Sequence, residues 1–391
     1  MLSQIEGSRA VAETVARCRP QVICAYPISP QTHIVEALSA LVKSGRLAGC
    51  EFVNVESEFA AMSVAIGASA AGARAYTATA SQGLLYMAEA LYNASGLGLP
   101  IVMTVANRAI GAPINIWNDH SDAMSQRDSG WIQLYAEDNQ AAADLHVLAF
   151  RLAEELSTPV MVCMDGFVLT HAVEAVDVPG QAAADRFLPP FQPRQVLDPD
   201  APVTIGAMVG PEAFTEVRYL AHVNQLAALA RMSELAREFT ATFDRPLAPL
   251  VSPYRCADAE TVVVALGSVL GTLKDTVDDL RAAGVPVGVL GLTAFRPFPV
   301  EAIRAAIGPA RRVVVLERAF AAGVGGIVAA DLAGALPDRE MHTVVAGLGG
   351  RPVTRDSLRE ALAAAFSGKL APLTFLDLDE RLLRAAEEVP S

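Results

Sequence analysis

The sequence predicts an α/β protein in which helices cover both faces of a mainly parallel sheet. Three observations favour this class. Short apolar segments alternate with segments whose apolar residues recur at helical spacing. The short segments are apolar throughout, as in strands that are buried on both faces. Finally, 52% of the 391 residues are hydrophobic, which is enough to fill the cores of two or three domains.

The first part of the chain alternates strands with helices. Strands are expected at residues 21–26, 50–56, 73–80, 100–106 and 158–166. Helices are expected at residues 32–45, which have helical spacing and end in glycine, at residues 57–72, which are rich in small residues, and at residues 82–96. We therefore expect one α/β domain over residues 1–173.

The middle of the chain has a different character. Residues 188–213 are rich in proline, and residues 218–243 have the pattern of a long amphipathic helix. We expect residues 174–258 to form a connector that packs on the first domain. The strand–turn–helix order then returns three times between residues 261 and 336, followed by one more strand segment. A second α/β domain is expected over residues 259–391.

Charge and hydropathy argue against several classes of function. The net charge of −13 disfavours nucleic acid or an anionic membrane surface as a partner. Residues 1–20 lack the basic and apolar regions of a secretory signal. No apolar run reaches the roughly 18 residues that a membrane span needs. We expect a cytoplasmic protein with no nucleic-acid or membrane partner.

The five cysteines are scattered through the chain, mostly in apolar segments. They are Cys18, Cys24, Cys50, Cys163 and Cys256, and no pair has the Cys-x-x-Cys spacing of a zinc or iron–sulfur site. We expect reduced structural thiols and no cluster in this chain.

Polar residues follow each strand that is expected in the first domain. Ser29 follows the first strand, Glu56 and Glu58 the second, residues 79–83 the third, residues 107–122 the fourth and residues 164–167 the last. The carboxyl ends of parallel strands share one edge of the sheet, so these segments should line one crevice. The sequence therefore predicts a ligand site at that edge.

Glu58 and Arg108 are the most informative charged residues at this edge. Glu58 starts a helix, where its charge alone would complement the helix dipole by roughly 0.3–1 kcal/mol. Because that helix is very apolar, its first turn should be partly buried, and a buried carboxyl group can share or exchange a proton. Glu56 is the competing candidate. Arg108 can either cap its strand or offer a fork of donors to a substrate carboxylate.

Other chemistries are disfavoured at this edge. Ser81 lies in "TASQG", which lacks the first glycine of a nucleophile elbow, and no His–Asp pair is defined. Asp119, His120 and Asp122 match no zinc spacing, so we expect a hydrogen-bonded loop there and no metal ligand. The glycine turns at residues 267–271 and 321–326 lack the GxGxxG pattern and are weak evidence for a nucleotide.

Several long motifs, in order, resemble one family. They are "AYPISPQT" from residue 25, "VESEFAAMSVAIGASAAGARAYTATASQGL" from residue 55, "VANRAIGAPINIWNDHSDAMSQRDSGW" from residue 105 and "MDGFVLTH" from residue 164. Nearly end to end, the chain resembles the alpha subunit of the 2-oxoacid:ferredoxin oxidoreductases, especially the pyruvate type. The resemblance implies a pyrimidine-binding domain of thiamine diphosphate enzymes, followed by an α/β domain like the C-terminal domain of transketolase.

The resemblance also implies an activity and a role for four residues. Enzymes of this family cleave a 2-oxoacid on thiamine diphosphate, release CO2, pass electrons to iron–sulfur clusters and form an acyl-coenzyme A. Glu58 matches the glutamate that bonds the cofactor's aminopyrimidine, and Arg108 matches the arginine that binds the substrate carboxylate. Pro27 and Ser29 match a loop close to cofactor and substrate. Ser29 stands where the pyruvate enzymes usually have threonine, which leaves room for a larger 2-oxoacid such as phenylglyoxylate.

The chain lacks parts that such a reaction needs. It has no Gly-Asp-Gly segment with a downstream asparagine, the usual Mg2+–diphosphate site of thiamine enzymes. The resemblance therefore implies a beta subunit that holds the diphosphate, Mg2+ and a [4Fe-4S] cluster, with gamma-type and delta-type subunits beside it. Coenzyme A would be the co-substrate, and ferredoxin or a flavin/NAD subunit would accept the electrons.

Two rival functions remain at this point. One is a non-catalytic structural or regulatory subunit of such a complex, which the presence of Glu58 and Arg108 disfavours. The other is a transketolase-like enzyme or decarboxylase without redox partners. That enzyme would need its own diphosphate site.

Overall fold

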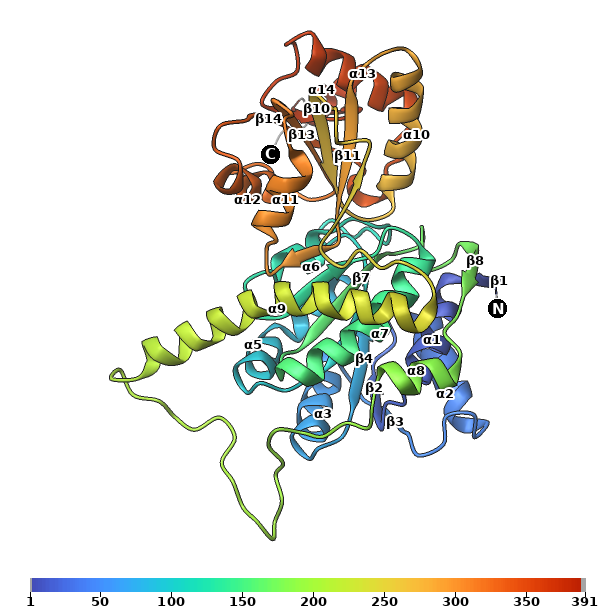
Figure 1. The fold of residues 1–391 in the computed structure, drawn as a ribbon, viewed down its shortest axis with the longest axis vertical. Helices are drawn as coiled ribbons and strands as arrows, with labels where there is room; N and C mark the ends of the chain where they lie inside the picture. The colour runs from blue at the N-terminus through green and yellow to red at the C-terminus, as the bar shows by residue number, and fades with distance from the viewer. Residues whose placement is uncertain (1, 388–391) are drawn as a thin grey trace.

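A seven-stranded sheet forms the centre of the first part of the chain in the computed structural model, which describes residues 2–387 (Figure 1). The strand order is β12-β6-β7-β5-β4-β2-β3, and every neighbouring pair is parallel except β12 with β6. The strands are β2 (Val22–Ala25), β3 (Glu51–Asn54), β4 (Ala75–Thr79), β5 (Val102–Asn107), β6 (Ile132–Tyr135), β7 (Val160–Asp165) and β12 (Ala294–Arg296). The expected parallel sheet is thereby confirmed. Strand β6, which lies next to the edge strand β12, has four residues and was not predicted from the sequence.

Helices cover both faces of this sheet. One face packs against α1 (Gly7–Arg17), α2 (Thr32–Lys43) and α7 (Asn139–Leu156), through residues such as Val11, Leu38 and Leu145. The other face packs against α3 (Glu58–Ala70), α4 (Ser81–Tyr86) and α5 (Ala88–Gly96), through residues such as Met62 and Leu91. The helix expected over residues 82–96 is thus two helices. A short helix, α6 (Ser121–Ser125), follows β5 at the carboxyl edge.

A second, six-stranded sheet occupies the last part of the chain (Figure 1). Its order is β15-β14-β13-β10-β11-β9, with β9 antiparallel and the others parallel. The strands are β9 (Val251–Tyr254), β10 (Thr261–Ala265), β11 (Val287–Leu292), β13 (Arg312–Glu317), β14 (Glu340–Val345) and β15 (Leu373–Phe375). The helices are α10 (Val269–Ala282), α11 (Val300–Ile307), α12 (Ile327–Ala335), α13 (Arg355–Phe366) and α14 (Glu380–Glu387), with a short 3-10 turn η1 (Leu348–Gly350). Strand β12 leaves this unit and joins the first sheet beside β6, so the two sheets are physically linked.

Three further elements, β1, β8 and α8, lie outside the two large sheets. Strand β1 (Leu2–Glu6) pairs antiparallel with β8 (Val173–Asp177), which brings the start of the chain beside the segment that follows β7. Helix α8 (Gln181–Phe187) leads into a stretch with little regular structure over residues 188–213.

The long helix α9 (Phe214–Phe243) differs along its length. Its second half packs on α7 and α8 through the buried residues Met232, Leu235 and Phe239. Its first half is exposed and extends beyond the body of the protein (Figure 1). None of the helices described, α9 included, combines the length and apolar character needed to cross a bilayer.

Candidate active site

The loops that follow the strands of the first sheet meet at one edge, and Asp122 joins two of them. Its carboxylate accepts hydrogen bonds from the backbone N–H groups of Ser81 (2.9 Å), Arg108 (3.0 Å) and Ala123 (2.7 Å). It also accepts one from Nδ2 of Asn107 at 2.8 Å. Burial raises the pKa of Asp122 to about 6, although these hydrogen bonds act to lower it. Asp122 therefore fixes the ends of β4 and β5 relative to each other.

The structure separates the two candidate glutamates. Glu58 is only 8% exposed, whereas Glu56 is exposed. Ser57 lies between them in extended conformation and caps α3, because its side chain accepts a hydrogen bond from the N–H of Ala60 at 3.2 Å. This cap places Glu58 in the first turn of the helix.

The carboxylate of Glu58 lies against α4 without a protein partner. A Cβ atom on Gly83 would lie 2.7 Å from Glu58 Oε1 and 2.6 Å from Thr79 Oγ1, so these three residues are in close contact. Glu58 makes no hydrogen bond or ion pair with any residue from 2 to 387, and the buried hydroxyl of Thr79 also has no partner there. The Thr79 hydroxyl is fully buried, where polar groups are normally hydrogen-bonded, and the Glu58 oxygens keep some contact with solvent, so both groups are available to a ligand.

Arg108 and Ser29 are brought together, as expected. Arg108 is 7% exposed, and its Nη1 donates to the backbone carbonyl of Ser29 at 2.9 Å. Its Nε donates to the carbonyl of Asn115 at 3.2 Å. These two bonds use only part of the five N–H donors of a guanidinium group. The hydroxyl-bearing residue Ser29 and its neighbour Pro27 are exposed at the rim.

Ser81 is a structural residue in this site. It has a positive φ of 48°, and its hydroxyl donates to the backbone carbonyl of Ala109. Its other side-chain contact is Gln82. A nucleophilic serine needs a base within hydrogen-bond reach, and no histidine of the described chain bonds to Ser81.

The segment around Asp119 and His120 is a hydrogen-bonded loop, as predicted. Asp119 accepts hydrogen bonds from the backbone N–H of Ser121 (3.0 Å) and of Gly349 (3.2 Å). His120 bonds through Nε2 to Asp165 at 2.6 Å. Together with the four bonds to Asp122, these contacts use the carboxylates of the loop and one ring nitrogen of His120, whereas the buried His120 Nδ1 has no partner among residues 2–387.

Asp165, at the end of β7, links the two sheets. It accepts hydrogen bonds from the Ser268 N–H (3.0 Å) and from Arg318 Nη1 (2.7 Å), both in the second unit. Burial alone would raise the pKa of Asp165, but the charges of His120 and Arg318 outweigh it and hold the pKa well below its usual range. The glycine turn at Gly267 (φ 77°) lies against this carboxylate, since a Cβ there would be 2.9 Å from Asp165 Oδ1. The glycine turn at Gly267 therefore contacts the carboxylate of Asp165.

Sequence reasoning missed the roles of Thr79, Gly83, Asp122 and Asp165. The position of Asp165 and Asp122 after strands was a usable signal, because polar residues there face the common edge. Nothing in the sequence indicated that Gly83 would touch Glu58. That contact joins two helices and depends on their packing.

All five cysteines are buried free thiols. Burial raises the pKa of Cys18, Cys24 and Cys50 to about 12. Thiols with such pKa values are poor metal ligands and nucleophiles at neutral pH.

Comparisons with known proteins show which family the chain belongs to. The family model described as pyruvate flavodoxin/ferredoxin oxidoreductase, thiamine diphosphate-binding, matches residues 13–236. The model of pyruvate:ferredoxin oxidoreductase core domain II matches residues 259–358. The chain is 48% identical over 390 residues to pyruvate synthase subunit PorA of Methanosarcina barkeri, with 97% of both chains covered.

Two solved structures share the fold. One is the 2-oxoglutarate:ferredoxin oxidoreductase from Magnetococcus marinus, with a TM-score of 0.70 and 19% identity. The match covers 93% of this chain and 65% of that longer chain. The other is a split-gene transketolase, an inactive beta4 tetramer, with a TM-score of 0.56 and 14% identity, covering 94% of this chain and 99% of that one. The predicted thiamine-enzyme and transketolase-like architecture is confirmed, and the chain belongs to the pyruvate flavodoxin/ferredoxin oxidoreductase family.

Proposed function

We propose that this chain is the alpha subunit of a multi-subunit, coenzyme A-dependent 2-oxoacid oxidoreductase. The complex would convert a 2-oxoacid, in the first place pyruvate, to acyl-coenzyme A and CO2. The observation that carries this proposal is Glu58, a residue only 8% exposed at the carboxyl edge of the sheet, whose carboxylate has no partner among residues 2–387. Glu58 lies within the part of the chain that matches the thiamine diphosphate-binding family model.

The residues around Glu58 fit the aminopyrimidine end of thiamine diphosphate. Glu58 offers a carboxylate, Thr79 offers a buried hydroxyl without a partner, and Gly83 keeps the space between them free of a side chain. When bound, the cofactor supplies the carbon that adds to a 2-oxoacid and takes up the electrons released with CO2. Glu58 would accept a hydrogen bond from the ring and hold a proton there. Burial would strengthen that bond.

Arg108 and Ser29 would bind the substrate. The guanidinium of Arg108 is buried and oriented by the carbonyls of Ser29 and Asn115, which leaves donors for a substrate carboxylate. The hydroxyl of Ser29 and the ring of Pro27 are exposed at the rim and would contact the substrate and the cofactor there. A larger 2-oxoacid such as phenylglyoxylate is the second candidate, because Ser29 lacks the methyl group of threonine.

The remaining parts of the reaction are assigned to partners. A beta subunit would hold the diphosphate, Mg2+ and a [4Fe-4S] cluster, and gamma-type and delta-type subunits would complete the complex. Ferredoxin or a flavin/NAD subunit would accept the electrons. The buried cysteines with raised pKa support this division, since they are unsuited to hold a cluster. We also retain the cytoplasm as the expected compartment.

We propose that the chain divides into two domains and a connector between them. Residues 1–173 would form the pyrimidine-binding domain, residues 174–258 the connector and residues 259–391 the transketolase-like domain. The separate sheets support this division. The exception is β12, which belongs to the last range by sequence and to the first sheet by pairing.

A matched pair of variants separates this function from that of a non-catalytic subunit. Glu58→Gln keeps the shape of the side chain but cannot hold the proton, so it should lower turnover of the assembled complex by roughly 100-fold or more. Glu56→Gln, two residues away and exposed, should leave turnover unchanged. Size-exclusion chromatography shows whether both complexes assemble. Equal turnover of the two assembled complexes would reject the catalytic proposal.

A further inference from the structure

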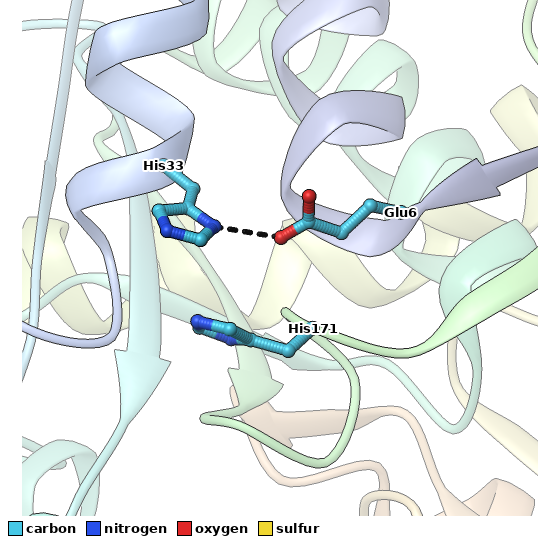
Figure 2. Close-up of side chains that lie close together, drawn as sticks. All are labelled: Glu6, His33 and His171. Carbon is cyan, nitrogen blue, oxygen red and sulfur yellow. Dashed lines mark hydrogen bonds and ion pairs between the residues drawn. The ribbon is translucent and has the colours of Figure 1, made fainter.

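Glu6, His33 and His171 form a cluster outside the site described above (Figure 2). Glu6 ends β1, His33 lies in the first turn of α2, and His171 follows the loop after β7. One ligand atom from each residue lies within 4.8 Å of those from the other two. His33 Nδ1 and Glu6 Oε1 are 2.7 Å apart, and the two imidazole ring centres are 4.6 Å apart.

The backbone around the cluster is firmly held. The N–H groups of Gly7 and Ser8 donate to the carbonyls of Ala172 (3.0 Å) and Thr170 (2.9 Å). These bonds tie the residue after Glu6 to the residue after His171. A site assembled from segments 27 and 138 residues apart in sequence, and fixed by the backbone, is largely preformed.

The ring of His171 is also oriented by its neighbours. It stacks on Phe167 at 4.8 Å, and its Nδ1 shares a hydrogen bond with Thr170 Oγ1 at 2.7 Å. Histidines that bind metals commonly donate their second ring N–H to such a partner. With Nδ1 protonated toward Thr170, Nε2 carries the free lone pair, and it has no hydrogen-bond partner within residues 2–387.

Two imidazoles and one carboxylate are a ligand set that zinc accepts. Imidazole nitrogen favours zinc and similar transition metals over magnesium and calcium, which prefer oxygen. The side chains of His33 and Glu6 are 49% and 34% exposed, so an ion can enter from solvent and keep a water ligand.

We propose that Glu6, His33 and His171 bind a divalent transition-metal ion, with Zn2+ as the first candidate, and that the ion fastens the start of α2 to the loop after β7. Local sequence spacing predicted no metal ligand because the three residues are far apart in the chain. The consequence concerns the rim of the active site. His33 lies three residues after Pro30, which precedes α2, and Pro30 touches Gly166 of the loop after β7, since a Cβ on Gly166 would lie 2.6 Å from the proline ring. A bound ion would therefore stiffen the segment that carries Ser29.

The test is Zn2+ titration of the full-length chain after chelator treatment, followed by isothermal calorimetry. The wild-type chain should bind one equivalent. Each of three ligand variants, Glu6→Gln, His33→Asn and His171→Asn, should weaken Zn2+ binding by roughly 100-fold. Loss of a direct ligand should cost at least as much affinity as loss of a residue that hydrogen-bonds a ligand. His222→Asn is the matched control, because His222 is exposed on α9, far from the cluster in sequence, and that variant should bind as the wild type does.

Thermal unfolding and circular dichroism distinguish loss of the metal site from misfolding of a variant. Zn2+ should raise the thermal midpoint of the wild type and of His222→Asn, and should not raise that of the three ligand variants. Circular dichroism without metal should show the same fold in all five proteins. Absence of saturable binding to the wild type would overturn the proposal, and so would equal affinity in the ligand variants and the control. No measurement uses turnover, so this outcome is independent of the proposed enzyme activity.

Discussion

Substitution of Gly83 by alanine tests the packing around Glu58 directly. A methyl group at Gly83 would lie 2.6 Å from Thr79 Oγ1, 2.7 Å from Glu58 Oε1 and 2.8 Å from Glu58 Cγ. Real Cβ contacts closer than 3.0 Å essentially do not occur, so the Glu58 carboxylate or α4 must move. Glu58 is buried at the start of a helix and cannot turn freely into solvent.

The expected change in the stability of Gly83→Ala follows from two opposing effects. Overpacking in a tight site costs about 1–3 kcal/mol. Alanine is a better helix former than glycine by roughly 1 kcal/mol, which offsets part of that cost. The loss of stability should therefore be about 0–2 kcal/mol, and the chain should still fold. Turnover should fall much more, by roughly 100-fold, because displacement of a catalytic group by about 1 Å has that effect.

The assay compares Gly83→Ala with Gly67→Ala in the assembled complex. Gly67 lies on α3, the helix that carries Glu58, and a Cβ there would meet nothing within 4 Å. Gly67→Ala should raise stability by about 1 kcal/mol and leave turnover unchanged. Dye-linked oxidation of the 2-oxoacid reports turnover, and urea unfolding reports stability. If Gly83→Ala turned over as fast as Gly67→Ala, the Glu58 carboxylate would not need its observed position, and the reasoning would fail.

Three further predictions concern the same edge of the sheet. Arg108→Ala should lower kcat/KM for the 2-oxoacid by an amount equivalent to about 2–4 kcal/mol, while the kinetics of coenzyme A stay nearly unchanged. Arg108→Lys should recover only part of this lost kcat/KM, since an ammonium group cannot form the planar fork. An equal loss for both substrates in steady-state kinetics would contradict a role in substrate binding. Ser29→Thr should penalise an aryl 2-oxoacid relative to pyruvate by about 1–3 kcal/mol, and equal effects on the two acids would show that Ser29 does not set substrate size. Ionisation of Asp122 should lower the free energy of unfolding by about 3 kcal/mol as pH rises from about 4 to about 6, because its pKa is raised from 3.8 to about 6 and the folded chain keeps the proton to higher pH. In urea unfolding across this range, the free energy of unfolding of Asp122→Asn should lack this dependence on pH. The same pH dependence in Asp122→Asn and the wild type would refute the prediction.

The predicted and observed elements agree best where a segment is long or apolar throughout. Strands β2, β4, β5 and β7 were predicted because they are buried on both faces, and their hydrophobic residues show this locally. Strand β6 was missed because Gln133 interrupts its apolar residues; in the structure the Gln133 amide is buried and donates to the carbonyl of Ala123 at 2.9 Å. The break at Met87 between α4 and α5 was also missed, since its apolar spacing continues through the break.

The position of the candidate site in the fold follows from the order of strands in the sequence. Parallel strands put their carboxyl ends at one edge, so the sequence alone assigns Ser29, Glu58 and Arg108 to the same edge of the sheet. The sequence left Glu56 as a competing candidate, since both glutamates follow the same strand. The structure distinguishes them by burial, because Ser57 caps α3 and places Glu58, but not Glu56, in its first turn.

The sequence by itself determined the fold class, the order of strands and helices and the family, because hydrophobic periodicity and motif order are properties of the chain alone. Only the tertiary structure decided which residues touch. It placed β12 beside β6, closed Gly83 onto Glu58, joined Asp165 to Arg318 and brought Glu6, His33 and His171 together. The physical reason is that periodicity states which face of an element is buried but carries no information about the partner on that face. Contacts between residues far apart in sequence follow from the packing of whole elements, and the short-range pattern of either segment does not specify them.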